Sequence, residues 1–119
     1  MDLNQITTII FDVDGVFTDG SLYFSDNGVT TTKFNVHDGM GCILLKEAGI
    51  ELLILTARHS DEVIRRFKDL GIDKIFTKVL KKRDFIKNYA KTHNLVKKEL
   101  AMMGDDLQDL SAIDEVGVF

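Results

Sequence analysis

Short apolar runs rich in β-branched residues alternate along the chain with longer segments whose apolar residues recur at helical spacing. The strand-like runs lie at residues 7–11, 50–55, 74–77, 99–103 and 116–118. The helix-like segments lie at residues 39–48, 61–70 and 82–92. This alternation favours a parallel sheet, because parallel strands need crossover connections long enough to hold a helix. We expect a three-layer, Rossmann-like α/β fold.

One departure from this alternation follows the first strand. Residues 22–25 and 29–34 are prone to form strands, and Asp26, Asn27 and Gly28 separate them with turn-forming residues. We therefore expect a β-hairpin flap over about residues 21–34.

Length and composition indicate one ordinary globular domain, residues 1–119, with 45% hydrophobic and 29% charged residues. The formal net charge of -4 and the lack of a long basic run argue against nucleic acid or an anionic membrane as partner. No apolar run approaches the roughly 20 residues that span a bilayer, and the first residues lack a secretion-signal pattern. We expect a cytoplasmic location, and we expect Cys42 to be a buried structural thiol.

Acidic residues follow two of the predicted strands. Asp12 and Asp14 come directly after the first strand, and Asp105 and Asp106 follow the run at residues 99–103. Either pair has a structural interpretation, as a turn at Asp14 or as a helix cap at Asp106. Taken together, the two clusters favour a shared functional site, because the carboxyl ends of parallel strands meet at one edge of the sheet.

The other predicted strand ends bring further polar side chains to this edge. Thr56 and Arg58 follow the strand at residues 50–55, and Lys82 follows the strand at 74–77 after a short loop. A hydroxyl and a cation near several carboxylates suit phosphoryl transfer, which depends on positioning and charge neutralisation.

Hydrolysis of a phosphate monoester needs a nucleophile, a proton donor and charge neutralisation together. We expect Asp12 to attack phosphorus and form an aspartyl-phosphate. Asp14 would protonate the leaving oxygen and then accept a proton from water. Thr56 would donate its hydroxyl to a phosphoryl oxygen, and Lys82 would offset negative charge.

A hard cation such as Mg2+ would compensate the repulsion among these carboxylates. The expected ligands are Asp12, the backbone carbonyl of Asp14, and Asp105. We expect Asp106 and Asp109 to be outer-shell groups that orient waters or the nearby lysine.

In this order, the residues resemble the four motifs of the haloacid dehalogenase superfamily. The matching segments are Asp12-Val13-Asp14-Gly15, Leu55-Thr56, Lys82 and Gly104-Asp105-Asp106-Leu107-Gln108-Asp109. The closer resemblance, over residues 10–118, is to the 3-deoxy-D-manno-octulosonate 8-phosphate phosphatase subfamily. It rests on residues 12–20, 33–41 and 55–58.

That resemblance implies a haloacid dehalogenase fold with no large cap domain, in which the hairpin arms help assemble a homotetramer. It also implies a Mg2+-dependent phosphatase for a phosphorylated ulosonic acid of the octulosonate or sialate type, in lipopolysaccharide or sialic-acid-like sugar synthesis. Expected substrate-binding residues are Thr56, Arg58, His37 and Gly39. For Arg58, pairing with a nearby aspartate is the alternative.

Several positions depart from the family pattern. Ala57 stands where glycine is usual, and His37 stands where the octulosonate enzymes commonly have arginine. Lys81 is an alternative to Lys82 as the motif lysine, although spacing favours Lys82. The family usually continues beyond Phe119 with a helix, a strand and a glycine-rich tail, so the sequence resembles a phosphatase without its C-terminal part.

Two other functions remain open at this stage. One is a non-hydrolytic oligomerisation or ligand-binding module of the same fold. The other is a receiver-like switch that also uses an aspartate and Mg2+. Asp12, Asp14, Thr56 and Asp105 argue against the first, because a purely structural domain has no reason to gather so many carboxylates at a strand edge. Asp14 argues against the second, because a general acid beside the nucleophile shortens the life of a phosphorylated intermediate.

Overall fold

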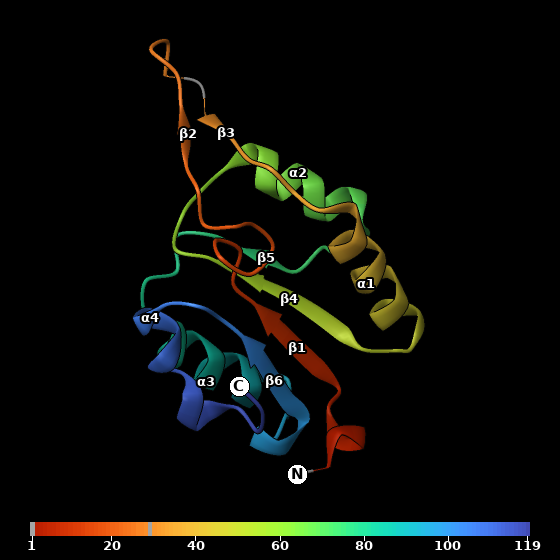
Figure 1. Ribbon diagram of the computed structural model, residues 1–119. Helices are drawn as coiled ribbons and strands as arrows, with labels where there is room; N and C mark the ends of the chain where they lie inside the picture. Colours follow the sequence, from red (N-terminus) through yellow and green to blue (C-terminus); the bar gives the residue numbers. More distant parts are fainter. Residues whose placement is uncertain (1, 29) are drawn as a thin grey trace.

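A four-stranded parallel sheet forms the centre of the computed structural model, which describes residues 2–28 and 30–119 (Figure 1). The strand order is β5-β4-β1-β6. The strands are β1 (Thr8–Phe11), β4 (Glu51–Leu55), β5 (Ile75–Phe76) and β6 (Leu100–Met103). In the centre of the sheet, Ile10 is aligned with Leu53 on one side and Met102 on the other. Each strand lies inside a predicted run and is one or two residues shorter than that run.

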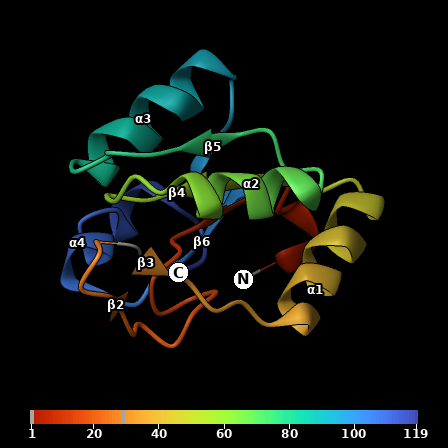
Figure 2. The same cartoon turned by 90° about the horizontal axis from the view of Figure 1, so that it is seen from above.

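Helices cover both faces of the sheet, as predicted. The helices are α1 (Val36–Glu47), α2 (Asp61–Asp69), α3 (Lys82–Thr92) and α4 (Leu107–Leu110), with short 3-10 helices at Leu3–Gln5, Lys97–Glu99 and Ile113–Glu115. Seen from above in Figure 2, α1 and α3 lie apart with strands between them. None of the helices in the described part of the chain has the length and apolarity that a membrane crossing requires.

Alternate residues of the central strands point into two separate cores. On β4, Leu52 and Ile54 pack toward α1 and α2, whereas Leu53 and Leu55 pack toward α3. Because side chains of a strand alternate between faces, a continuous apolar run is what a strand covered on both sides requires. Cys42, on α1, is buried in the first core as predicted, and burial raises the pKa of its thiol.

Two helix starts follow from side-chain caps. The Ser60 hydroxyl accepts a hydrogen bond from the amide of Val63 at 3.4 Å and caps α2, as the sequence suggests. The predicted start of the first helix at Gly39 is wrong by three residues. Asn35 caps α1 instead, because its side-chain oxygen accepts a hydrogen bond from the amide of His37 at 2.8 Å.

The predicted hairpin is present but shorter than expected. Strand β2 (Tyr23–Phe24) pairs antiparallel with β3 (Thr30–Thr31), and the pair projects from the body of the molecule (Figure 1). Val29, which we placed in the second arm, lies outside the described residues. The first arm exposes large apolar side chains, and Phe24 is 75% exposed.

The predicted fifth strand at residues 116–118 is wrong. Val118 forms a single parallel bridge to Ala101 at the outer edge of β6. The backbone there makes hydrogen bonds on both sides of the bridge, with Met102 N donating to Val118 O at 2.9 Å. One bridging residue does not make a strand, although Val116 is buried in the second core as its apolar character suggests.

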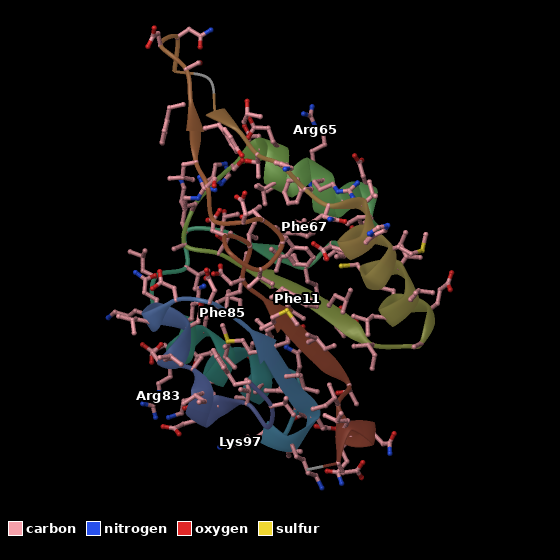
Figure 3. The ribbon with its side chains drawn as sticks, viewed as in Figure 1. Phe11, Arg65, Phe67, Arg83, Phe85 and Lys97 are labelled. Atoms are coloured by element: carbon pink, nitrogen blue, oxygen red, sulfur yellow. The ribbon has the colours of Figure 1, made fainter. Side chains whose placement is uncertain are left out.

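The stability of the first core depends on an aromatic cluster. Phe67 of α2 points toward the sheet (Figure 3), is fully buried, and makes edge-to-face contacts with Phe17 and Phe34 at ring-centroid distances of 4.8 and 5.8 Å. We expect Phe67→Ala to lower the free energy of unfolding by about 3–5 kcal/mol, since it removes buried area and leaves a cavity. Urea denaturation measures this change.

The matched control on the same helix is Lys68→Ala, because Lys68 is exposed. Its free energy of unfolding should stay within about 0.5 kcal/mol of that of the parent chain. Equal destabilisation by the two substitutions would contradict the assignment of Phe67 to the core.

Candidate active site

The carboxyl ends of the central strands open into a cavity of about 320 Å³. Both acidic clusters reach it, together with the loop after β4 and the first residue of α3. Its lining residues are Asp12, Asp14, Gly20, Thr56, Ala57, Arg58, Lys82, Asp105, Asp106 and Gln108. The structure thus gathers side chains that are far apart in the sequence, at the edge of the sheet where parallel α/β folds bind ligands.

Lys82 is the buried cation of this cavity. Its Nζ lies 3.1 Å from Oδ1 of Asp12 and 2.5 Å from Oδ1 of Asp109. The Lys82 side chain is 3% exposed, whereas Lys81 is exposed to solvent. Of the two neighbouring lysines, Lys82 is therefore the one that contacts the candidate nucleophile.

The two carboxylates that share this lysine differ in protonation behaviour. Burial raises the pKa of Asp12 and the nearby Asp109 carboxylate adds to this, while the amide of Val13 and Lys82 act in the opposite direction. For Asp109, burial also favours the neutral form, but hydrogen bonds from Lys82 and from backbone amides outweigh it and lower the pKa. Asp109 is thus held as a carboxylate beside the lysine.

Asp109 also organises the loop after β6. Its Oδ2 accepts hydrogen bonds from the amides of Asp105 and Asp106 at 3.0 and 3.1 Å. Gly104 makes this possible, because a Cβ at that position would lie 2.5 Å from the Cβ of Asp109. Asp106 caps α4 by accepting a hydrogen bond from the amide of Leu107 at 2.6 Å. This agrees with the interpretation of Asp106 as a helix cap.

Three carboxylates come close enough to share a cation. One oxygen each from Asp12, Asp105 and Asp109 lies within 4.8 Å of the other two. Gly15 allows this approach, since it has a φ of +84° and a Cβ there would lie 1.6 Å from Oδ2 of Asp105. Hard carboxylate oxygens in this arrangement fit Mg2+.

Asp14 makes a bidentate ion pair with Arg58. Nε of Arg58 donates to Oδ2 of Asp14 at 2.8 Å, and Nη2 donates to Oδ1 at 2.6 Å. The sequence left open whether Arg58 binds substrate or pairs with an aspartate, and the structure shows the pair. Thr56 is buried beside them, and its hydroxyl oxygen accepts from the amide of Arg58 at 3.3 Å.

Two predicted substrate-binding residues do not line this cavity. Both residues belong to α1, which begins at Val36. His37 borders a separate cavity of about 190 Å³ beside Cys42. Gly39 lies against α2, where a Cβ would come 2.6 Å from Nη2 of Arg66.

Besides Ala57, which was noted only as a departure from the family pattern, two lining residues were given no role from the sequence. Gln108 lies inside the acidic motif that contains Asp105 and Asp109, and Gly20 ends the conspicuous segment that starts at Asp12. Their positions in the motifs were the available signal. Neither residue type by itself indicates a chemical role, so only the geometry identifies them.

The chain matches the family model described as haloacid dehalogenase-like hydrolase over residues 29–119. It is 37% identical over 115 residues to the 3-deoxy-D-manno-octulosonate 8-phosphate phosphatase KdsC of Haemophilus influenzae, and 33% identical over 118 residues to KdsC of Escherichia coli K12. These alignments cover 97% and 96% of the chain but 64% and 61% of the relatives. The chain therefore spans less than two thirds of the length of these curated relatives.

Solved structures show the same architecture. The chain superimposes with a TM-score of 0.90 on the 3-deoxy-D-manno-octulosonate 8-phosphate phosphatase of Moraxella catarrhalis, crystallised with a magnesium ion, a phosphate ion and a KDO molecule. That match has 38% identity and covers 95% of the chain and 65% of the other. A probable YrbI family phosphatase from Pseudomonas syringae gives a TM-score of 0.91 at 38% identity, covering 95% and 64%. The predicted fold is confirmed, and the chain belongs to the haloacid dehalogenase-like hydrolase family.

Proposed function

We propose that this chain is a Mg2+-dependent phosphatase that hydrolyses a phosphorylated sugar acid of the octulosonate or sialate type. The observation that carries the proposal is the position of Asp12 in the cavity, in contact with Lys82 and beside Asp105. A nucleophilic carboxylate, a fixed cation and a metal-binding carboxylate are the groups that phosphoryl transfer needs. The relatives with 33–37% identity are phosphatases of such a sugar acid, which supports the substrate class.

We assign the metal to Asp12, Asp105 and the backbone carbonyl of Asp14. Asp109 lies close enough to contribute, but its oxygens already accept hydrogen bonds from Lys82 and from two backbone amides. We therefore assign Asp109 to the outer shell, where it holds Lys82 and the loop that carries Asp105. When bound, Mg2+ would neutralise negative charge on the phosphate and on the carboxylates.

The reaction that these residues support has two displacements. An oxygen of Asp12 attacks phosphorus and forms an aspartyl-phosphate, while the phosphorus–oxygen bond to the sugar breaks and Asp14, in its protonated form, supplies a proton to the leaving oxygen. Water then attacks the phosphorus of the aspartyl-phosphate, and Asp14 takes the proton of that water. Inorganic phosphate leaves, and both carboxyl groups return to their starting states. Lys82 and the Thr56 hydroxyl offset charge on the phosphoryl oxygens.

We expect Asp12→Asn to reduce Mg2+-dependent phosphate release by at least about 10³-fold, because an amide oxygen cannot form the aspartyl-phosphate. The measurement is phosphate release from 3-deoxy-D-manno-octulosonate 8-phosphate and from sialic acid 9-phosphate. The matched control is Asp69→Asn, since Asp69 is exposed at the end of α2, and its rate should equal that of the parent chain.

Two outcomes would contradict the proposal. A folded, Mg2+-binding parent chain that releases no phosphate from either substrate would favour the non-hydrolytic binding or oligomerisation module. A phosphorylated chain that persists without releasing phosphate would favour the receiver-like switch.

We also propose that the hairpin assembles a homotetramer. Support comes from β2 and the residue before it, because Leu22, Tyr23 and Phe24 are exposed by 52%, 45% and 75%. Adjacent large apolar side chains on a projecting hairpin mark an interaction surface in a water-exposed position.

Phe24→Ser should therefore shift the chain to smaller species, because it removes the most exposed aromatic ring of the hairpin without touching either core. Size-exclusion chromatography with light scattering measures the molar mass. Leu80→Ser is the control, since Leu80 is 72% exposed but lies in the loop before α3. A parent chain that is already a monomer would overturn the assembly proposal.

A further inference from the structure

The turn at the tip of the hairpin contains the only asparagine of the chain that precedes a glycine. Ser25, Asp26, Asn27 and Gly28 form this turn, and the amide of Gly28 donates a hydrogen bond to the carbonyl of Ser25 at 2.9 Å. All four residues are exposed, and the hairpin projects from the body of the molecule (Figure 1). Water and hydroxide therefore reach the side-chain amide of Asn27.

Gly28 leaves that amide open to attack by the next backbone nitrogen. Glycine carries no side chain that would hinder the approach of its nitrogen, and its backbone reaches conformations that are closed to other residues. The other asparagines of the chain precede larger residues, in the pairs Asn4-Gln5, Asn35-Val36, Asn88-Tyr89 and Asn94-Leu95. Asn27 is thus the asparagine whose side chain its neighbour can approach most easily.

The Ser25 hydroxyl is placed at the oxygen of the same amide. Its Oγ donates a hydrogen bond to Oδ1 of Asn27. When a nucleophile adds to Cγ of Asn27, negative charge develops on Oδ1, and a donor that is already in position stabilises that charge. The turn therefore brings together an amide carbonyl, a hydrogen-bond donor for its oxygen and an adjacent nitrogen nucleophile.

The short ladder of the hairpin lets this nitrogen become available. The amide of Gly28 must leave the carbonyl of Ser25 before it can attack. The ladder consists of the pairs Tyr23 with Thr31 and Phe24 with Thr30. A two-stranded ribbon is marginally stable by itself, so it opens locally and releases the Gly28 nitrogen.

We propose that Asn27 is a self-modification site, at which the turn converts asparagine into aspartate and isoaspartate. The Gly28 nitrogen loses its proton to hydroxide and bonds to Cγ of Asn27. The bond from Cγ to Nδ2 breaks, and Nδ2 takes a proton from water and leaves as ammonia, which restores the hydroxide. Water then opens the cyclic imide at either of its carbonyls, and this gives aspartate or isoaspartate. Both products add one negative charge beside Asp26 to a chain whose formal net charge is -4.

The test follows this conversion over time in mildly alkaline buffer. Replacing the amide NH2 by a hydroxyl group raises the mass by about 1 Da, and tandem mass spectrometry of a protease digest assigns the change to a residue. In the folded parent chain, Asn27 should convert while the other asparagines keep their mass. Ser25→Ala should slow the conversion by about 2- to 10-fold, the range that corresponds to one lost hydrogen bond.

The matched control is Ser21→Ala, because Ser21 is an exposed serine of the hairpin that lies outside the turn. Its Asn27 should convert at the rate of the parent chain. Asn27→Gln should remove the mass change, since the longer side chain would have to close a larger and less favourable ring. In concentrated urea, where the turn is lost, the parent chain and Ser25→Ala should convert at equal rates.

Two results would overturn the proposal. One is an Asn27 that converts no faster than the other asparagines of the folded parent chain. The other is an equal rate in the folded parent chain and in folded Ser25→Ala, because the reaction would then depend on the Asn27-Gly28 dipeptide alone and not on the turn. None of these readouts requires phosphate release, so a failure of the proposed function leaves this test unaffected.

Discussion

The contact of Lys82 with Asp12 and Asp109 joins the parts of the chain that make the site. Lysine is rarely buried unless it is paired, and here the first residue of α3 is held between the end of β1 and the start of α4. Removing one partner of a buried ion pair leaves an uncompensated charge in a poorly solvated place, which is strongly unfavourable. The same contact that positions the candidate nucleophile therefore also fixes how the elements around the second core meet.

Close approach of two loops completes this arrangement. Gly15 lets the loop after β1 pass beside Asp105, and Gly104 lets the loop after β6 pass beside Asp109. A side chain at either glycine would overlap a carboxylate that the site needs. The acidic cluster is thus a property of two backbone turns as much as of the acidic residues, which explains why aspartates and glycines occur together in both motifs.

Periodicity and turn residues were enough to predict the layers of the fold and the edge of the sheet at which the polar residues meet. Both the layers and this edge depend on local sequence patterns, such as the apolar run of β4. Contacts set by tertiary packing were not predictable. One example is the start of α1, which depends on the cap by Asn35, and another is the position of His37 outside the cavity. Whether Arg58 binds substrate or pairs with an aspartate depends on the distance between the loop after β4 and the loop after β1. No local sequence pattern determines that distance. A single bridge at Val118 likewise depends on the neighbouring strand.

The two cations of the cavity, Lys82 and Arg58, differ in how far they are exposed to solvent. Lys82 is a compact charge that is enclosed by two carboxylates, so its ammonium group is held in one place within the cavity. The Arg58 side chain is 40% exposed, so solvent weakens its ion pair with Asp14 more than it weakens the contacts of Lys82. Burial thus distinguishes the two cations, since Lys82 is enclosed by two carboxylates and Arg58 is within reach of solvent.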